Sequence, residues 1–337
     1  MSVSRIFVTG ATGFLGRHIV ERLLRNGHVL TLAVRDEATC PVQWQKDAQI
    51  SIIATGPLER ATELEAVLPG HQAVVHAAGL AHVAPRDAAE AEAAFMHANA
   101  EATDRLARAA QRAGIASFVH VSSIAAVTSN ASEQAVDDNV REWRPESAYG
   151  RSKVAAEEAL AAARGDMLAL SLRPPLIVGA EAPGNWAALQ RLAATGLPLP
   201  FGSVENRRSL IGVDALAEAI AGLCGRDWQP VLSGNYCIAG TPPVSLRAMI
   251  TELRTGMGIP SRLFSFPTPL LNAALLVMGR RRQAEGLFGD LVLDDSRFRQ
   301  TFAMEAAENS ADMRETIHRS GAGYARARTG GRGGARS

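Results

Sequence analysis

The amino-acid sequence predicts an α/β protein with a doubly wound parallel sheet and a smaller C-terminal domain. Short apolar segments such as 29–34 and 117–121 have the length and composition of strands that are buried on both faces. Longer stretches with helical periodicity, such as 17–25 and 88–112, separate these segments along the chain. With 337 residues, of which 47% are hydrophobic, the chain can bury a large core.

A glycine-rich turn follows the first apolar segment, residues 5–8. Gly10 permits a tight turn, Gly13 lets the backbone approach a pyrophosphate at the N-terminus of a helix, and Gly16 lets that helix pack closely on the strand. A purely structural turn is the alternative, because glycine ends strands in many folds. The order of strand, glycine turn and helix favours a dinucleotide site.

Tyr149 and Lys153 lie one helical turn apart at the start of a helical stretch, 154–164. We expect the Lys153 ammonium to lower the pKa of Tyr149, as a general acid/base requires. The segment 117–121 carries Ser123 near its C-terminal end, where its hydroxyl can hydrogen-bond the reacting oxygen of a substrate. A surface tyrosine beside a solvated lysine is the alternative. With the glycine turn upstream, the pair favours hydride chemistry on a nicotinamide dinucleotide.

The end of the second strand, 29–34, bears on the choice of cofactor. A site that prefers NAD(H) usually places an acid there, which binds the ribose hydroxyls. Here Val34 takes that place and Arg35 follows, and a positive charge suits a ribose 2′-phosphate. We therefore expect NADP(H) to be favoured. Asp36 leaves NAD(H) open, because its carboxylate could pair with Arg35 or reach the ribose.

With these motifs the chain resembles the extended short-chain dehydrogenase/reductase family, the NAD(P)-dependent epimerase/dehydratase group that acts on nucleotide sugars. The resemblance covers roughly residues 4–300 and implies a Rossmann-type sheet. It implies that Ser123, Tyr149 and Lys153 form the catalytic triad, and that the protein is a homodimer joined through helices of the cofactor domain. The implied cofactor-binding residues are Gly10, Thr12, Gly13, Phe14, Leu15, Gly16, Arg35, Ala77, Ala78, Gly79, Asn99, Tyr149, Lys153, Pro174 and Leu176.

The resemblance also implies that segments 183–185 and 206–211 hold the diphosphate of a sugar nucleotide. Asn185 would stand at the start of a helix, where an N-cap is the alternative role and the helix terminus itself favours an anion. Arg208 could clamp phosphate oxygens with its guanidinium fork, or be a solvated arginine. His82 stands in a loop that could face the sugar, and a plain polar loop residue is the alternative.

Within that family the chain most resembles a UDP-sugar branch with 4-epimerases and 4-ketoreductases. A 4-epimerase reuses one tightly held cofactor, whereas a ketoreductase draws on the NADPH pool. The expected preference for NADP(H) therefore favours a UDP-4-keto-6-deoxy-hexosamine 4-reductase. A UDP-hexose or UDP-N-acetylhexosamine 4-epimerase is the alternative. A reductase of an unrelated small carbonyl compound and a non-catalytic NADP-sensing protein are the alternatives from other classes.

The organisation that we expect is a cofactor domain in residues 1–178, to which a strand near 208–213 returns. Residues 179–324 would mainly form the substrate (nucleotide-sugar) domain. The tail 325–337 is rich in glycine and arginine and is expected to be disordered.

Composition indicates the cellular compartment of the protein and argues against several classes of ligand and partner. The net charge of +1, without a long basic stripe, argues against nucleic-acid binding. Three scattered cysteines indicate a reducing compartment and argue against a metal site. No signal peptide precedes the first strand, and the apolar segment 270–278 is shorter than the about 20 residues of a membrane span, so we expect a cytoplasmic protein without a span. The arginines at 280–282 suggest a basic helix terminus, with anionic lipid as the alternative ligand.

Overall fold

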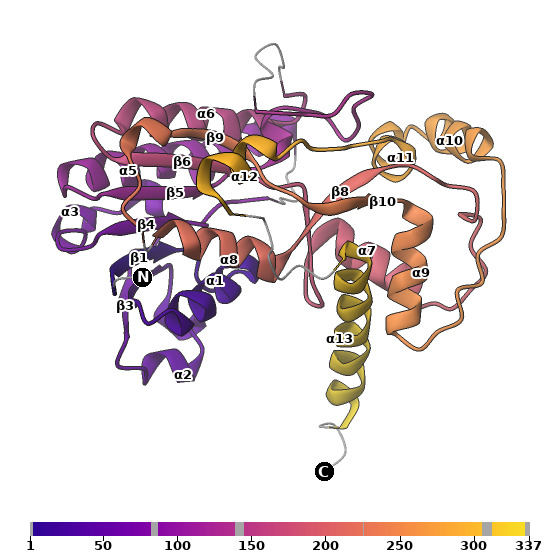
Figure 1. Cartoon of the computed structure of the whole chain (residues 1–337), viewed down its shortest axis with the longest axis horizontal. Helices are drawn as coiled ribbons and strands as arrows, with labels where there is room; N and C mark the ends of the chain where they lie inside the picture. The colour runs from indigo at the N-terminus through magenta and orange to yellow at the C-terminus, as the bar shows by residue number, and fades with distance from the viewer. Residues whose placement is uncertain (1–2, 82–86, 139–144, 225, 305–311, 334–337) are drawn as a thin grey trace.

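The computed structural model describes residues 3–81, 87–138, 145–224, 226–304 and 312–333 (Figure 1). Its main sheet has seven parallel strands in the order β3-β2-β1-β4-β5-β6-β9, which confirms the predicted α/β class. The strands are β1 (Arg5–Thr9), β2 (Val29–Val34), β3 (Ile50–Ala54), β4 (Ala73–His76), β5 (Ser117–Val121), β6 (Leu168–Arg173) and β9 (Gly234–Cys237).

The helices are α1 (Phe14–Arg25), α2 (Val42–Gln45), α3 (Leu64–Val67), α4 (Ala88–Phe95), α5 (Ala102–Arg112), α6 (Ala148–Ala163), α7 (Gly184–Ala193), α8 (Val213–Cys224), α9 (Leu246–Gly256), α10 (Thr268–Val277), α11 (Arg281–Phe288), α12 (Ser296–Phe302) and α13 (Met313–Gly333).

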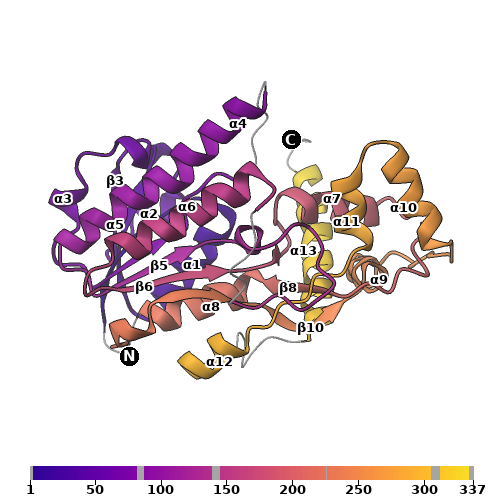
Figure 2. The same cartoon turned by 90° about the horizontal axis from the view of Figure 1, so that it is seen from above.

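Helices cover both faces of the seven-stranded sheet. One core joins β1, β2 and β4 to α1, α8 and α12, with Ile19, Leu216 and Phe298 fully buried. The other joins the opposite faces of β1, β4 and β5 to α3, α5 and α6, with Leu106 and Leu160 buried (Figure 2).

The structure corrects the strand that was expected to return to the cofactor domain. Strand β8 (Arg208–Gly212) lies in a second, three-stranded sheet, between β7 (Leu176–Val178) and β10 (Gly240–Val244). The side chain of Leu210 is buried there in a separate core with Val244. The elements that do return are α8, which packs against α1, and β9, which pairs with β6.

The tail prediction is also corrected, because α13 continues through residues 325–333. This helix packs closely on α9. A methyl group added at Gly256 would lie 2.1 Å from the His318 carbonyl oxygen, and one at Gly321 would lie 2.4 Å from that of Leu253. The contact anchors the helix, and the alanines and arginines that follow favour its continuation. No helix in the described part of the chain has the length and apolar character needed to cross a membrane.

Candidate active site

The glycine turn lies between β1 and α1, against the end of β4. Gly10 has a φ of +74°, and a methyl group added there would lie 2.4 Å from the Ala78 nitrogen and 2.5 Å from the Ala77 carbonyl carbon. One added at Gly16 would lie 2.0 Å from the Gly10 oxygen. Gly13 is the N-cap of α1 and offers no side chain to the N–H groups of its first turn. These residues fit a dinucleotide, because Gly13 carries no side chain at the helix terminus and the N–H groups there are donors for a pyrophosphate.

A buried chain of hydrogen bonds connects this turn to the helices behind it. Thr103 donates to the Asn99 carbonyl (2.6 Å), so its Oγ1 accepts from His76 Nε2 (3.0 Å). His76 Nδ1 then accepts from the Thr9 hydroxyl (2.7 Å). Burial lowers the pKa of His76 to about 3, so the ring is neutral. His76 is thus a satisfied core histidine, as its place in an apolar strand suggests.

Asn99 lies in a π-helical turn, Met96–Glu101, between α4 and α5. Its amide donates to the Leu80 carbonyl (3.0 Å) and to Ser152 Oγ (2.9 Å), and its oxygen accepts from the Leu80 nitrogen (2.7 Å). Asn99 therefore connects the loop after β4 to α6, and Gly79 in that loop leaves space for Asn99 and for Lys153. Such turns are frequent at functional sites.

The structure brings Ser123, Tyr149 and Lys153 together where α6 begins beside the end of β5. A methyl group added at Gly150 would lie 2.3 Å from the Ala125 oxygen, so only glycine permits this approach. Tyr149 forms a hydrogen bond with Ser123. The Lys153 ammonium is buried and donates to the Val121 carbonyl oxygen (2.9 Å). The three side chains form one site.

The electrostatics of the pair differ from the sequence expectation. Burial raises the pKa of Tyr149, and the hydrogen bond with Ser123 opposes that shift only in part. Burial also lowers the pKa of Lys153 to about 8, with the Glu157 carboxylate acting in the opposite direction. Lys153 was expected to lower the pKa of Tyr149; in the structure its ammonium is directed at a backbone carbonyl, and loss of solvation dominates at the phenol.

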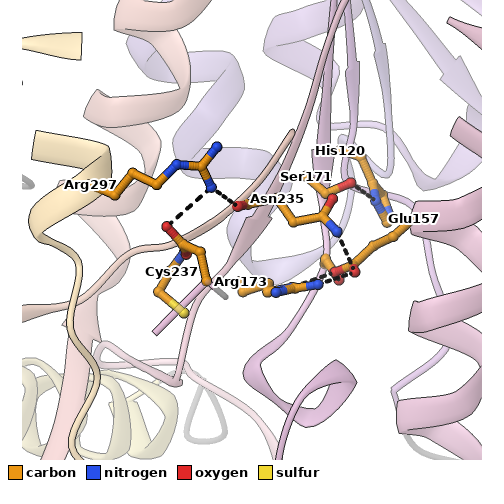
Figure 3. Close-up of polar contacts among 9 residues, drawn as sticks. His120, Glu157, Ser171, Arg173, Asn235, Cys237 and Arg297 are labelled. Atoms are coloured by element: carbon orange, nitrogen blue, oxygen red, sulfur yellow. Dashed lines mark hydrogen bonds and ion pairs between the residues drawn. The ribbon is translucent and has the colours of Figure 1, made fainter. Parts of the chain in front are cut away.

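A buried ion pair joins α6, the helix that carries Tyr149 and Lys153, to the sheet (Figure 3). Arg173, at the end of β6, holds Glu157 of α6 through two hydrogen bonds of 2.9 and 2.6 Å. Ser122 and Asn235 also donate to the Glu157 carboxylate, at 2.5 and 3.0 Å. The network fixes α6 to Ser122 directly after β5 and to strands β6 and β9. Sequence reasoning missed it, although Glu157 follows Lys153 by one helical turn and was the available signal.

The other expected cofactor residues lie in or directly before α1 and at the ends of the neighbouring strands. The Phe14 ring lies against Gly179, where an added methyl group would lie 2.9 Å from Phe14 Cζ, and Leu15 packs on the main core. The Thr12 carbonyl accepts from Arg17 Nε (3.2 Å). Pro174 accepts from the Ile124 nitrogen (3.0 Å), and Leu176 packs on the core of the second sheet.

Arg35 is exposed after β2, and it makes no hydrogen bond or ion pair with the rest of the described chain. Asp36 does not pair with it. Its carboxylate accepts from the Ala38 nitrogen (3.0 Å) and caps a short 3₁₀ turn.

The expected diphosphate residues lie near the second sheet. Arg208 Nη1 donates to the backbone oxygens of Asn130 (3.1 Å) and Gly289 (2.9 Å), and burial lowers its pKa. Asn185 is exposed in the first turn of α7, but Pro183 holds the N-cap position, so the N-cap alternative is wrong. His82 lies outside the described residues.

The sequence of this chain matches a known protein family over most of its length. The model of the NAD dependent epimerase/dehydratase family matches residues 6–228, about two thirds of the chain. The chain belongs to this family. The match includes the glycine turn and the Ser123, Tyr149 and Lys153 site, and it confirms the predicted family and enzyme class.

Curated family relatives carry different activities. The chain is 29% identical over 302 residues to a UDP-glucose 4-epimerase of Vibrio cholerae, which covers 88% of this chain and 89% of the relative. It is 30% identical over 260 residues to a ceramide reductase of Caulobacter vibrioides, covering 72% of this chain and 73% of the relative.

Solved structures share the whole fold. The Bordetella bronchiseptica enzyme WbmG in complex with NAD and UDP aligns over 96% of this chain and 95% of its own, with a TM-score of 0.73 and 21% identity. The UDP-glucuronic acid 4-epimerase of Bacillus cereus in complex with NAD aligns over 96% of each chain, with a TM-score of 0.72 and 17% identity. At these identities the likeness confirms the fold alone.

Proposed function

We propose that this epimerase/dehydratase family member is an NADPH-dependent reductase that acts on the C4 ketone of a UDP-4-keto-6-deoxy-hexosamine. The observation that carries the proposal is the exposed Arg35 after β2, which pairs with no acid in the described chain. A free guanidinium at this place suits the 2′-phosphate of NADPH, the cofactor that a reductase consumes. The buried phenol of Tyr149, which contacts Ser123, can donate the proton that reduction requires. The NAD- and UDP-containing complex of WbmG supports a nucleotide-sugar substrate.

The chain's own residues account for the proton transfer. The glycine turn and the N-terminus of α1 would hold NADPH, which would supply the hydride for the carbonyl carbon. The Tyr149 hydroxyl donates its proton to the oxygen that becomes the alcohol, while Ser123 hydrogen-bonds the same oxygen. Lys153, whose ammonium donates to the Val121 carbonyl oxygen (2.9 Å), would hold the nicotinamide ribose. Arg208 and Asn185 would hold the diphosphate, so that binding energy far from C4 positions the ketone.

Arg35 is the residue proposed to select NADPH. Arg35→Gln is expected to raise the KM for NADPH about 10- to 150-fold, the loss of one charge-assisted hydrogen bond of about 1.5–3 kcal/mol, and to leave the KM for NADH unchanged. Steady-state kinetics with both cofactors measures this. Arg25→Gln, at the exposed far end of α1, is the control with the same charge change. Equal effects of Arg35→Gln on NADPH and NADH would refute the assignment.

Arg208 is the residue proposed to bind the diphosphate. Its Nη1 donates hydrogen bonds to backbone carbonyls, whereas Nε and Nη2 make no hydrogen bond within the described residues. Arg208→Ala is expected to raise the KM for the UDP-sugar about tenfold or more and to leave the Kd for NADPH unchanged. Arg247→Ala, which removes an exposed guanidinium outside segments 183–185 and 206–211, is the control and should leave the KM for the UDP-sugar unchanged. Unchanged UDP-sugar kinetics in Arg208→Ala would remove the sugar-nucleotide assignment.

Two further candidates have support among the relatives. The Vibrio cholerae relative favours a 4-epimerase, and the ceramide reductase favours reduction of a lipid substrate. Reduction consumes NADPH in every turnover, whereas a 4-epimerase converts UDP-glucose to its C4 epimer without net consumption of NADPH, so the two measurements separate the candidates.

The three cysteines are free and buried, which suits the reducing conditions of the cytoplasm. The homodimer stays a prediction.

A further inference from the structure

The segment around α10 exposes an unusual amount of apolar surface. Helix α10 contains no buried residue, and Val277 at its end is 89% exposed. Of the ten large hydrophobic side chains that are exposed in the described chain, six lie within residues 264–278. We call these six the α10 surface: Phe264, Phe266, Leu270, Leu276, Val277 and Met278. Clusters of this kind mark interaction sites, whereas single exposed apolar residues do not.

Charged side chains flank the segment of the α10 surface, and none lies within that segment. Residues 263–279 contain no charged side chain. Arg262 stands on one side, and Arg280, Arg281 and Arg282 stand on the other, all exposed. Arg281 pairs with Glu285 at 2.8 Å, and Glu146 also acts on it. The other three arginines form no ion pair with the residues that the structure describes, so the rim of the surface is positive.

The position of the α10 surface leaves it accessible. In both views α10 lies at the end of the molecule farthest from the seven-stranded sheet, away from α5 and α6 (Figures 1 and 2). The ten residues of α10 span about 15 Å, half of a bilayer core, so the helix can lie in a membrane interface but not cross it.

We infer that the α10 surface docks this protein on an anionic lipid bilayer. The apolar side chains enter the boundary between headgroups and acyl chains, and the arginines on both sides bind lipid phosphates. Arginine at both ends of an uncharged apolar segment fits this partner, because the rim meets the negative layer while the centre meets hydrocarbon. The inference is independent of the substrate proposed above.

The test is co-sedimentation of the full chain with vesicles of phosphatidylcholine, with and without phosphatidylglycerol. We expect binding to the anionic vesicles that weakens with salt. Leu276→Ser/Val277→Ser should weaken it about tenfold. Arg280→Gln/Arg282→Gln should weaken it about 25-fold, at about fivefold per arginine.

Matched controls lie elsewhere on the surface. Val231→Ser removes an apolar side chain that is 84% exposed, and Arg25→Gln/Arg112→Gln removes the same charge from the cofactor half; all should bind like the parent. Unchanged thermal unfolding shows that each variant folds. Failure of the parent to bind anionic vesicles would overturn the inference, as would equal losses in the controls. A parent dimer that Leu276→Ser/Val277→Ser dissociates, without vesicle binding, would assign the surface to a second copy of the chain and overturn it too.

Discussion

Tyr149→Phe is expected to lower kcat for ketone reduction by about 10²- to 10⁴-fold, the range for loss of a general acid, with the Kd for NADPH unchanged. The substitution removes one oxygen, the proposed proton donor, and leaves a ring that packs on Phe95 with centroids 5.7 Å apart. The hydrogen bond with Ser123 is lost. Steady-state NADPH oxidation measures kcat, and cofactor fluorescence titration measures binding.

Tyr236→Phe is the matched control for this substitution. The Tyr236 ring is buried, and its hydroxyl donates to the Leu232 carbonyl (2.7 Å) within the main core. Loss of that bond should lower the free energy of unfolding by about 1 kcal/mol and leave kcat unchanged. If Tyr149→Phe kept the parent kcat, or if both variants lost activity alike, Tyr149 would not be the proton donor.

Gly10→Ala is expected to abolish most cofactor binding and to lower the free energy of unfolding by about 3 kcal/mol or more. Its Cβ would meet the backbone of Ala77 and Ala78 at 2.4–2.7 Å, where no flexible side chain can yield. The turn must therefore move away from β4, and the phosphate cradle moves with it. We expect the affinity for NADPH to fall about a hundredfold, or ~2.7 kcal/mol.

Gly114→Ala measures the loss of stability that the left-handed backbone conformation causes without a close contact to another strand. Gly114 has a φ of +70°, close to that of Gly10, and nothing lies within 4 Å of an added methyl group. It should lose about 1–2 kcal/mol of stability, the cost of the left-handed conformation alone, and bind NADPH normally. Thermal or denaturant unfolding and fluorescence titration compare the two variants. Equal losses at both positions would show that close approach to β4 contributes nothing.

Features that depend on local spacing could be predicted from the sequence. The glycine turn follows from three glycines at the end of an apolar segment, and the Tyr149 and Lys153 pair follows from one helical turn. Strand pairing is not local. Strand β8 has the apolar character of a strand in either sheet, and only its neighbours β7 and β10 decide its place.

The environment of the site could not be predicted in the same way. The pKa of Tyr149 rises because of burial, which arises from the whole fold, and the Glu157–Arg173 pair joins a helix to a strand end. The π-helical turn that presents Asn99 interrupts a segment that reads as one continuous helix. The composition of the C-terminus suggested disorder, but the glycines at 256 and 321 let α13 pack on α9.

The proposed ketone reduction is measured by multiple-turnover oxidation of NADPH by the purified chain, with a UDP-4-keto-6-deoxy-N-acetylhexosamine as substrate. We expect continued loss of NADPH absorbance, with one 4-hydroxy sugar nucleotide formed for each NADPH consumed, and no such loss with Tyr149→Phe. Absence of NADPH loss beyond one equivalent of enzyme, together with interconversion of UDP-N-acetylglucosamine and its C4 epimer, would contradict it and make the protein a 4-epimerase.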